Sequence, residues 1–507
     1  MEILEKISRR VVDFGSNIAF HSSEEEMTYE DLWEKSDRLA WQLDMELGLS
    51  KKAIVVYGHK NPWMVVCFFA CVKSGRAYCP VDTSMPEERI EAIVKAVDNV
   101  LVLATDEQDI QRLPDKVRVM SLEEIKEAAD SCLRIGTKGW VKPEDVFYII
   151  FTSGSTGEPK GVQITSENLS RYTQWSVTLG DSPKDKEGSI FLNQAPFSFD
   201  LSVMDTYTAL VSGGTVWCLD KEMQKETRRL LDYIAEGTIN YWVSTPSFAD
   251  VCLSDKGFDN SLLPELRVFL FCGEKLRRET AKRLRLRFPK SIIVNTYGPT
   301  ESTVAVSQAI INDEMIKADR PLPIGQPKPG TILRIIKDDG SIASDGEKGE
   351  IEIIGDTVSP GYFNNPEKTE QVFSMVNING KSMRAYRTGD EGFIENEVVH
   401  HCGRIDLQVK VHGYRIEMGD IEANLMSIGG IESAAVVPKT EENRIRYLAA
   451  FLVSPGAVGD HQDRRMVRIK LKEKLPEYMI PKKIVFIDKL PMTENGKTDR
   501  KKLEEYL

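Results

Sequence analysis

The chain has 507 residues, 41% hydrophobic and 28% charged, which is typical of a soluble globular protein with two or more domains. Its formal net charge of −12 argues against a general nucleic-acid binder, which would be basic. From Arg404 onward the chain has 19 Lys and Arg residues and 16 Asp and Glu residues, a net charge of +3. The rest of the chain has 47 basic and 62 acidic residues, a net charge of −15. A basic tail of this kind suits transient contact with an acidic partner, and chance on a solvated surface explains it equally well.

Targeting and metal signals are lacking in the sequence. The first ten residues have no apolar core of a signal peptide, and the longest apolar run, Trp63 to Val72, is about half a membrane span. The eight cysteines form no C-x-x-C pair and no cluster with histidine, which predicts buried free thiols and no structural zinc. We expect a cytoplasmic protein that does not insert into membranes.

Through about residue 400, short apolar runs alternate with polar, helix-like stretches. The alternation of strand and helix is typical of parallel sheets with helices on both faces, an α/β fold. Ligands of such sheets bind beyond the carboxyl ends of the strands, so the chemistry is expected just after these runs. The runs that predict strands are Ala53–Tyr57, Val146–Phe151, Ile190–Asn193, Gly214–Leu219, Tyr241–Ser244, Val268–Cys272 and Ile292–Thr296.

A loop rich in glycine and hydroxyl residues follows the second of these strands. It reads Thr152-Ser153-Gly154-Ser155-Thr156-Gly157 and reaches Lys160 before a polar segment that we expect to be helical. Small residues let backbone N–H groups approach an anion, hydroxyls add donors and the lysine adds a charge, so the loop predicts a phosphate site. The Walker A spacing and the Gly-x-Gly dinucleotide fingerprint are both absent from the sequence. Taken alone, the loop is also typical of a solvated turn.

Three later loops carry groups suited to a nucleotide. Tyr297 offers a flat ring for stacking a purine, and Glu301 an oxygen ligand for Mg²⁺. Asp390, just past a glycine turn, can accept hydrogen bonds from a ribose diol. Lys497, on a glycine-preceded loop, can act as a mobile charge. Each of these residues alone is also compatible with an ordinary turn or a solvated side chain.

The residue pattern of the sequence changes between Ile324 and Gly392. Apolar alternating runs flank Asp-Gly turns there, which predicts a small antiparallel sheet or barrel. After Gly403-Arg404-Ile405-Asp406, about a hundred residues mix short strands with helices. We therefore expect an N-terminal core at 1–402, with a β subdomain at about 324–400, and a smaller mobile α+β domain at 403–507.

Taken together, the motifs resemble those of the adenylate-forming superfamily of acyl-CoA synthetases, luciferases and nonribosomal peptide synthetase adenylation domains. The resemblance runs from Met27 to Lys497 and implies an ATP-dependent, AMP-forming ligase. The motifs, in family order, are Thr152 to Gly161, Tyr297-Gly-Pro-Thr-Glu301, Tyr386-Arg-Thr-Gly-Asp390, Gly403-Arg-Ile-Asp406, His412-Gly-Tyr-Arg-Ile-Glu417 and Asn495-Gly-Lys497.

The resemblance extends to the substrate pocket. Phe197-Ser-Phe-Asp200 looks like the adenylation-domain motif whose aspartate pairs with an α-ammonium group. The segments holding Cys272 and Val304 look like pocket segments of D-alanine–D-alanyl carrier protein ligases. This implies D-alanine as the substrate, the phosphopantetheine thiol of a small acidic carrier protein as the acceptor, and a part in lipoteichoic acid D-alanylation.

The resemblance also assigns roles to single residues. It implies Glu301 as the ligand of Mg²⁺, Lys497 as the catalytic residue and a contact of the amino acid, and Asp406 as a hinge. Rotation about that hinge would withdraw Lys497 and present the Gly413 loop. The implied ATP site comprises Thr152, Ser153, Gly154, Ser155, Thr156, Gly157, Lys160, Asn295, Thr296, Tyr297, Gly298, Pro299, Thr300, Asp390, His401, Cys402, Gly403, Arg404 and Lys497.

Other functions remain open at this stage. A freestanding adenylation enzyme for another small amino acid in nonribosomal peptide synthesis would share Asp200 and differ in pocket volume around Cys272 and Val304. A coenzyme A ligase would leave Asp200 as an unpaired buried charge. A catalytically inactive sensor would have lost a functional group, whereas Lys160 and Lys497 are both retained.

Overall fold

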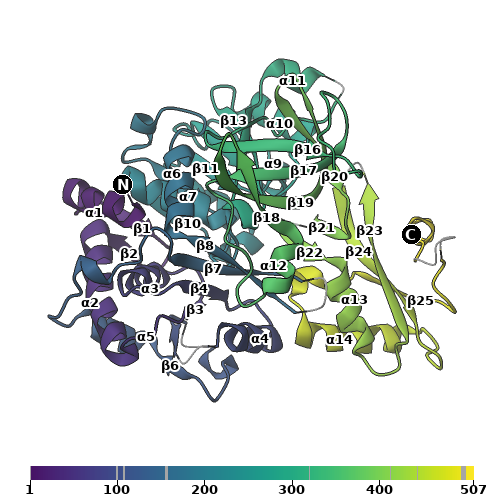
Figure 1. Ribbon diagram of the computed structural model, residues 1–507, viewed down its shortest axis with the longest axis horizontal. Helices are drawn as coiled ribbons and strands as arrows, with labels where there is room; N and C mark the ends of the chain where they lie inside the picture. The colour runs from purple at the N-terminus through teal and green to yellow at the C-terminus, as the bar shows by residue number, and fades with distance from the viewer. Residues whose placement is uncertain are drawn as a thin grey trace.

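The computed structural model describes residues 2–98, 101–106, 109–154, 158–318, 320–411, 413–441, 444–492 and 498–507. Figure 1 shows helix-flanked sheets in the first part of the chain (purple to teal), an antiparallel sheet (green) and a smaller C-terminal part at the right (yellow). The predicted α/β class with a smaller C-terminal α+β part is confirmed.

The first sheet has the strand order β6-β5-β3-β4-β7-β8. Its central strands β3 (Ile54–Gly58) and β4 (Tyr78–Asp82) are parallel and buried along their whole length, as expected of apolar strands covered on both faces. The other strands are β5 (Leu101–Ala104), β6 (Arg118–Met120), β7 (Val146–Thr152) and β8 (Lys160–Thr165), and the accompanying helices are α2 (Tyr29–Leu47), α3 (Pro62–Lys73), α4 (Glu87–Val97) and α5 (Leu122–Ala129).

The segment after the glycine-rich loop is a strand, where the sequence predicted a helix. β8 runs antiparallel to β7 and places Lys160 opposite Thr152. Val162, Ile164 and Thr165 are β-branched and prefer this pleated, half-buried environment. Helix α6 (Ser166–Ser176) begins only after Thr165, whose side chain caps it. β7 and β8 therefore form a hairpin, which brings Lys160 beside Thr152.

The second sheet has the order β15-β14-β13-β12-β11-β9-β10-β1-β2, parallel at its centre and antiparallel at both edges. Across the first and second sheets together, all seven predicted strands occur, with ends shifted by no more than one residue. Its strands are β1 (Ile18–His21), β2 (Glu26–Thr28), β9 (Ile190–Asn193), β10 (Thr215–Cys218), β11 (Tyr241–Ser244), β12 (Val268–Phe271), β13 (Ile292–Tyr297), β14 (Ser307–Ile310) and β15 (Gln326–Pro327). The helices here are α1 (Ile3–Phe14), α7 (Leu201–Ser212), α8 (Thr227–Glu236), α9 (Pro246–Ser254), α10 (Arg278–Arg287) and α11 (Asp313–Lys317).

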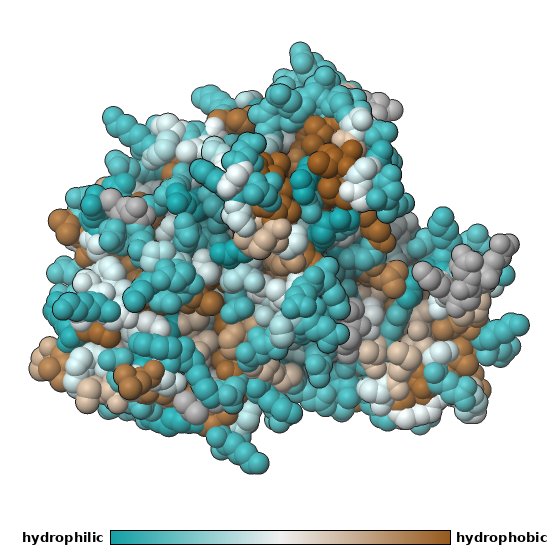
Figure 2. Space-filling model, viewed as in Figure 1, coloured by the Kyte–Doolittle hydropathy of each residue, from teal (hydrophilic) through white to brown (hydrophobic). Residues whose placement is uncertain are grey.

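The predicted antiparallel unit is a five-stranded sheet. It consists of β16 (Thr331–Ile336), β17 (Gly349–Gly355), β18 (Phe373–Ile378), β19 (Lys381–Glu395) and β20 (Val398–Arg404), with α12 (Pro366–Val372) beside it. Hydrophilic side chains cover most of the face in Figure 2, and apolar groups gather in its upper part over this sheet.

The C-terminal part begins with a hairpin, β21 (Gln408–Val411) and β22 (Tyr414–Glu417). A three-stranded sheet follows, of β23 (Ser433–Glu441), β24 (Arg444–Val453) and β25 (Lys483–Phe486), with helices α13 (Met418–Met426), α14 (His461–Lys474) and α15 (Arg500–Glu504). Its main apolar cluster draws its buried members from between Val411 and Ile484, so this part has a core of its own.

Two predictions about the whole chain can be compared with the structure. All eight cysteines are free thiols, but Cys132 is exposed and Cys402 half-buried, so the prediction of burial is wrong for these two. Cys132 follows α5 in a bend, and Cys402 lies in the half-buried end of β20. Within the described ranges, no helix has the length and apolarity to cross a membrane.

Candidate active site

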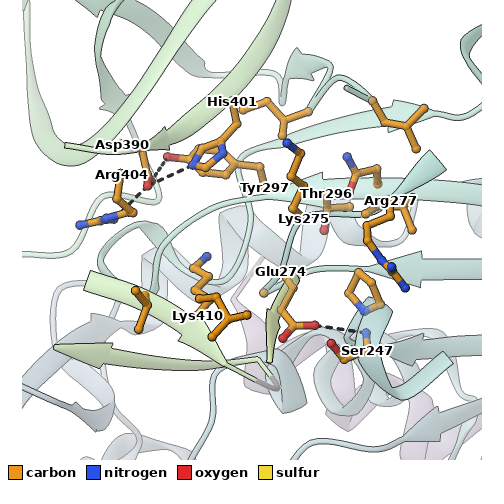
Figure 3. A pocket seen from close by; sticks show the side chains of 18 of the residues that line it. Ser247, Glu274, Lys275, Arg277, Thr296, Tyr297, Asp390, His401, Arg404 and Lys410 are labelled. Carbon is orange, nitrogen blue, oxygen red and sulfur yellow. Dashed lines mark hydrogen bonds and ion pairs between the residues drawn. The ribbon is translucent and has the colours of Figure 1, made fainter. Parts of the chain in front are cut away.

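A cavity of about 330 Å³ lies where the second sheet, the antiparallel sheet and β21 meet (Figure 3). Residues 295–298 line it from the carboxyl end of β13, Asp390 and His401 from β19 and β20, and Lys410 from β21. Its position at the carboxyl edge of a parallel sheet is where α/β folds bind ligands.

Asp390 organises one end of this cavity. Its Oδ2 accepts a hydrogen bond from the Tyr297 hydroxyl at 2.6 Å, and its Oδ1 lies 3.2 Å from His401 Nε2 and 3.0 Å from Arg404 Nη1. Burial opposes ionisation, but His401 and Arg404 outweigh it and hold the pKa of Asp390 well below its usual range. The carboxylate is therefore ionised at neutral pH and can act as a hydrogen-bond acceptor.

The loop after β13 shapes the neighbouring wall. The side chain of Asn295 donates to the Pro323 carbonyl at 2.7 Å, and the Thr296 hydroxyl donates to the Phe271 carbonyl at 2.8 Å. A Cβ atom on Gly298 would lie 2.5 Å from the Ala305 Cα, so only glycine fits there. These hydrogen bonds hold the loop in place at the cavity wall.

A second, smaller pocket of about 30 Å³ shares Gly298 and Asp390 with the first. It brings together three of the four residues predicted to contact the amino acid, Asp200, Cys272 and Val304, with Thr300, Pro299, Lys410 and Arg415 beside them. The fourth, Lys497, lies outside the described residues. A pocket of this size admits only a small chemical group.

The polar and apolar ends of this small pocket are distinct. Asp200 precedes α7 and is only 8% exposed, and burial raises its pKa to about 6. Cys272 follows β12, and its Sγ lies 3.6 Å from the Val304 carbonyl oxygen. Val304 has φ +66°, which is rare for a β-branched residue and is imposed by the surrounding loop.

The cradle, as we call the predicted phosphate loop from Thr152 to Lys160, is described in part, because Ser155, Thr156 and Gly157 lie outside the described residues. The Thr152 hydroxyl is buried, and no hydrogen-bond partner is found for it in the described chain. At Gly154 a Cβ atom would lie 2.2 Å from the Glu158 carbonyl oxygen, so the turn requires glycine. The described part of the cradle thus offers one buried hydroxyl without a partner among the described residues.

Strand β22 lies against this cradle. The Ser153 hydroxyl donates to the Arg415 carbonyl at 2.8 Å and accepts from the Glu417 N–H at 3.1 Å. Lys160 Nζ lies 3.3 Å from Glu417 Oε1. Two residues predicted to meet phosphate therefore contact the C-terminal part in this structure.

Glu301 is fully buried among cations. Its Oε2 lies 2.6 Å from Arg415 Nη1. Its Oε1 accepts a hydrogen bond from the Tyr362 hydroxyl at 2.8 Å and lies 4.0 Å from Lys160 Nζ. Burial opposes its ionisation, but Arg415 and then Lys160 outweigh it and lower the pKa to about 2.

Glu301 is the candidate ligand for a divalent cation. It is an ionised carboxylate of the kind that Mg²⁺ prefers, although in this arrangement the Arg415 guanidinium is paired with its Oε2. In the part of the chain that is described, no three His, Cys, Asp or Glu side chains cluster as a metal cage. A bound Mg²⁺ would therefore take its remaining ligands from phosphate and water, as this ion commonly does.

The turn of the β21–β22 hairpin reaches the core beside the cavity. The Gly413 N–H donates to Glu274 Oε1 at 2.7 Å, and Glu274 Oε2 accepts from the Ser247 N–H at 3.1 Å (Figure 3). Gly413 has φ +84°, and a Cβ there would lie 2.4 Å from Thr245 Cγ2. Glycine is needed for both the conformation and the close approach.

The predicted hinge lies between the antiparallel sheet and this hairpin. Asp406 is exposed, its Oδ1 accepts from Arg404 Nε at 2.8 Å, and the Ile405 N–H donates to the Gly389 carbonyl at 2.8 Å. Cys402 and Gly403 belong to the adjoining strand β20. Lys497 and His412 lie outside the described residues.

Sequence reasoning gave no role to four charged residues that the structure places in the site: Glu274, Lys410, Arg415 and Glu417. One signal was available. Arg415 and Glu417 stand two apart, and in a strand such positions point to the same side. Two opposite charges on one face of a buried strand indicate specific partners.

Comparisons with known proteins identify the chain's relatives. The family model "AMP-binding enzyme" matches residues 7–363, and "AMP-binding enzyme C-terminal domain" matches residues 420–497. The chain is 44% identical over 508 residues to a D-alanine–D-alanyl carrier protein ligase of Bacillus mycoides (strain KBAB4), and 43% identical to one of Bacillus cereus (strain AH187), covering 99% of both chains in each case.

Solved structures share the fold over the full length. Holo-PA1221, an NRPS protein containing adenylation and PCP domains bound to a vinylsulfonamide inhibitor, superposes with TM-score 0.85 at 25% identity, covering 100% of this chain and 84% of that one. The Vibrio cholerae adenylation domain AlmE, in complex with glycyl-adenosine-5'-phosphate, superposes with TM-score 0.84 at 22% identity, covering 100% and 97%.

Proposed function

The chain belongs to the AMP-binding enzyme family, and from that premise we propose that it activates D-alanine with ATP and transfers the D-alanyl group to a carrier-protein thiol. The observation that carries the amino-acid specificity is the pocket of about 30 Å³ in which Asp200 stands near Cys272 and Val304. A carboxylate there can pair with an ammonium group, and the small remaining space favours a small side chain such as a methyl.

In the first half-reaction the D-alanine carboxylate attacks the α-phosphate of ATP, an oxygen–phosphorus bond forms, and pyrophosphate leaves. We assign the leaving phosphates to Thr152, Ser153, the glycine loop and Lys160, and the adenine to the loop 295–300. Asp390 would accept the ribose hydroxyls, with His401 and Arg404 beside it. Mg²⁺ held by Glu301 would spread the phosphate charge. Positioning and charge stabilisation supply most of such catalysis.

In the second half-reaction a phosphopantetheine thiol attacks the acyl carbon of the adenylate. The carbon–sulfur bond forms as the bond from carbon to the phosphate oxygen breaks, the thiol proton passes to solvent, and AMP leaves. We assign the core to 1–402, the mobile domain to 403–507 and the hinge to Asp406. The Gly413 turn, held by Glu274, belongs to this step, and Lys410 lines both pockets beside the reacting groups. The basic C-terminal part suits an acidic carrier.

The test is the loading of a purified carrier protein that bears phosphopantetheine. With ATP, Mg²⁺ and labelled D-alanine, the carrier should acquire a thioester that hydroxylamine releases. The same carrier without the prosthetic group is the control and should stay unlabelled. Preferential loading of a different amino acid, or of coenzyme A in place of the carrier, would contradict the proposal.

Cys272 tests the stereochemical part of the proposal. The enantiomers of alanine differ in where one methyl points, and a methyl-sized clash is worth roughly 1–3 kcal/mol, or about 10–200-fold. Cys272→Ala should raise kcat/KM for L-alanine by about tenfold or more and change that for D-alanine little. The measurement is the ratio of the two kcat/KM values in pyrophosphate exchange.

A matched control is Cys252→Ala, which removes another buried thiol from a different apolar cluster. It should leave the enantiomer ratio at its wild-type value. If Cys272→Ala also leaves the ratio unchanged, the cysteine does not shape the methyl pocket. Preference for another small amino acid would then favour a freestanding adenylation enzyme.

A further inference from the structure

The turn that carries Asp200 joins the carboxyl end of β9 to the start of α7. It runs from Gln194 to Asp200, and within it the Phe199 N–H donates to the Pro196 carbonyl at 2.9 Å. Asp200 is the proposed partner of the substrate ammonium, so the position of this turn sets the position of the carboxylate. Whatever fixes the turn is therefore part of how the amino acid is bound.

Lys60 reaches the start of this turn from the first sheet. It lies between β3 and α3, and its buried Nζ donates to the Asn193 carbonyl at 3.1 Å and to the Gln194 carbonyl at 2.8 Å. Hydrogen bonds from a charged donor are roughly twice as strong as those between neutral groups. Lys60 thus ties the second sheet to the first at the point where the turn begins.

Asp205 ties the same point to the helix on which the turn ends. It lies on α7 and is fully buried, and its Oδ1 accepts from the Asn193 side chain at 2.7 Å and from the Thr206 hydroxyl at 3.0 Å. Asn193 is therefore held by its carbonyl to Lys60 and by its side chain to Asp205. These three residues, which we call the clasp, close the two ends of the turn into one buried network.

The backbone of Lys60 is strained. Its φ is +34°, in the left-handed region that residues other than glycine rarely adopt. The Cys218 thiol, at the end of β10, donates to the Lys60 carbonyl at 3.4 Å and lies 3.5 Å from Asn193 Oδ1. A strained backbone persists only where its surroundings impose it, and it often marks a functional position. Here it delivers a charged side chain from the first sheet to the second.

The clasp is costly if its only role is to join two sheets. Burial lowers the pKa of Lys60 and raises the pKa of Asp205, so both groups are charged at an energetic disadvantage. Asp205 Oδ2 is also buried, and no hydrogen-bond partner is found for it among the described residues. Apolar residues of similar volume would join the sheets at least as firmly. Buried polar networks, in contrast, specify one geometry.

We infer that Lys60 is a positioning residue of the amino-acid pocket, which acts through Asn193 and Asp205 to fix the turn that carries Asp200. The inference rests on the proposed function for the identity of the substrate. Asp200 makes the contact with the ammonium, and the clasp determines where its carboxylate stands.

Pyrophosphate exchange by full-length Lys60→Met tests the inference. Methionine keeps the length of the side chain and removes the ammonium. The KM for D-alanine should rise on the order of ten- to a hundredfold, because a binding group is misplaced, whereas kcat and the KM for ATP should stay near their wild-type values. A role in stability alone would lower the folded fraction, and with it kcat, without raising the KM.

Asp205 supplies a second pair of variants. Asp205→Leu removes the acceptor and should raise the same KM, whereas Asp205→Asn keeps an oxygen for the Asn193 side chain and should raise it less. Lys73→Met is the matched control, because Lys73 is a buried lysine of α3 that donates to the Trp33 carbonyl of α2 at 2.8 Å, and a wild-type KM is expected. Thermal unfolding shows whether each variant is folded. Equal KM values for D-alanine in Lys60→Met and Lys73→Met would overturn the inference.

Hydrogen exchange of the substrate-free enzyme gives a readout that needs no amino acid. The amides of residues 194–200 should exchange faster in Lys60→Met and Asp205→Leu than in wild type, and at the wild-type rate in Lys73→Met. Unchanged exchange of this segment in Lys60→Met would also overturn the inference. If the wild-type enzyme does not use D-alanine, the proposed function fails, and the exchange rates of the segment still decide whether the clasp fixes the turn.

Discussion

Replacing Lys497 with alanine is expected to lower amino-acid-dependent pyrophosphate exchange by about a hundredfold or more, while transfer from supplied D-alanyl adenylate stays largely intact. The proposed role of this lysine is to neutralise the D-alanine carboxylate and the α-phosphate as they meet. Loss of one preorganised charge contact in a transition state costs about 10²–10³ in rate.

The two half-reactions should differ because the C-terminal part contributes different groups to each. In the arrangement described here, that part presents Lys410, the Gly413 turn and Arg415 to the site. Lys501→Ala, which removes an exposed lysine of α15, is the control and should affect neither step. Equal damage to both half-reactions in Lys497→Ala would contradict a role confined to adenylation.

Asp200→Asn should raise the KM for D-alanine on the order of a hundredfold and spare the KM for ATP. The side chain is only 8% exposed, and its proposed partner is the substrate ammonium. Removing one member of a buried charge pair costs about 3–5 kcal/mol, because the other charge remains unpaired. If the variant lost affinity for ATP and kept its KM for D-alanine, the amino-acid pocket would have been misassigned.

The same residue predicts a pH dependence. Burial raises the pKa of Asp200 to about 6, so its carboxylate becomes protonated as the pH falls through that value. Protonation removes the charge that pairs with ammonium. The wild-type KM for D-alanine should therefore rise about tenfold per pH unit below pH 6. In Asp200→Asn the same KM should stay level across this window.

Local sequence patterns predicted much of the fold. The runs Ile190–Asn193 and Tyr241–Ser244 are strands at the predicted bounds, because buried parallel strands leave a continuous apolar signature. The segment after the cradle was misassigned as helix. Lys160 to Thr165 is short and mixed in polarity, so its strand form is set by pairing with β7 and not by its own pattern.

Many residues of the candidate site could be predicted from the sequence, but the contacts between residues distant in the chain could not. Asp200, Cys272 and Val304 line one pocket, as their motifs indicated, because each follows or precedes an element at the same sheet edge. The contacts of Arg415 with Glu301 and of Glu417 with Lys160 span more than a hundred residues. They depend on how two separately folded parts are oriented, which local patterns do not encode.

The most direct test of the account is pyrophosphate exchange by the wild-type enzyme with D-alanine, L-alanine, glycine and D-serine, each over a full concentration range. The account predicts the highest kcat/KM for D-alanine, with L-alanine lower by at least about tenfold because its methyl points at the wall that holds Cys272. A higher kcat/KM for L-alanine, glycine or D-serine would contradict the D-alanine assignment.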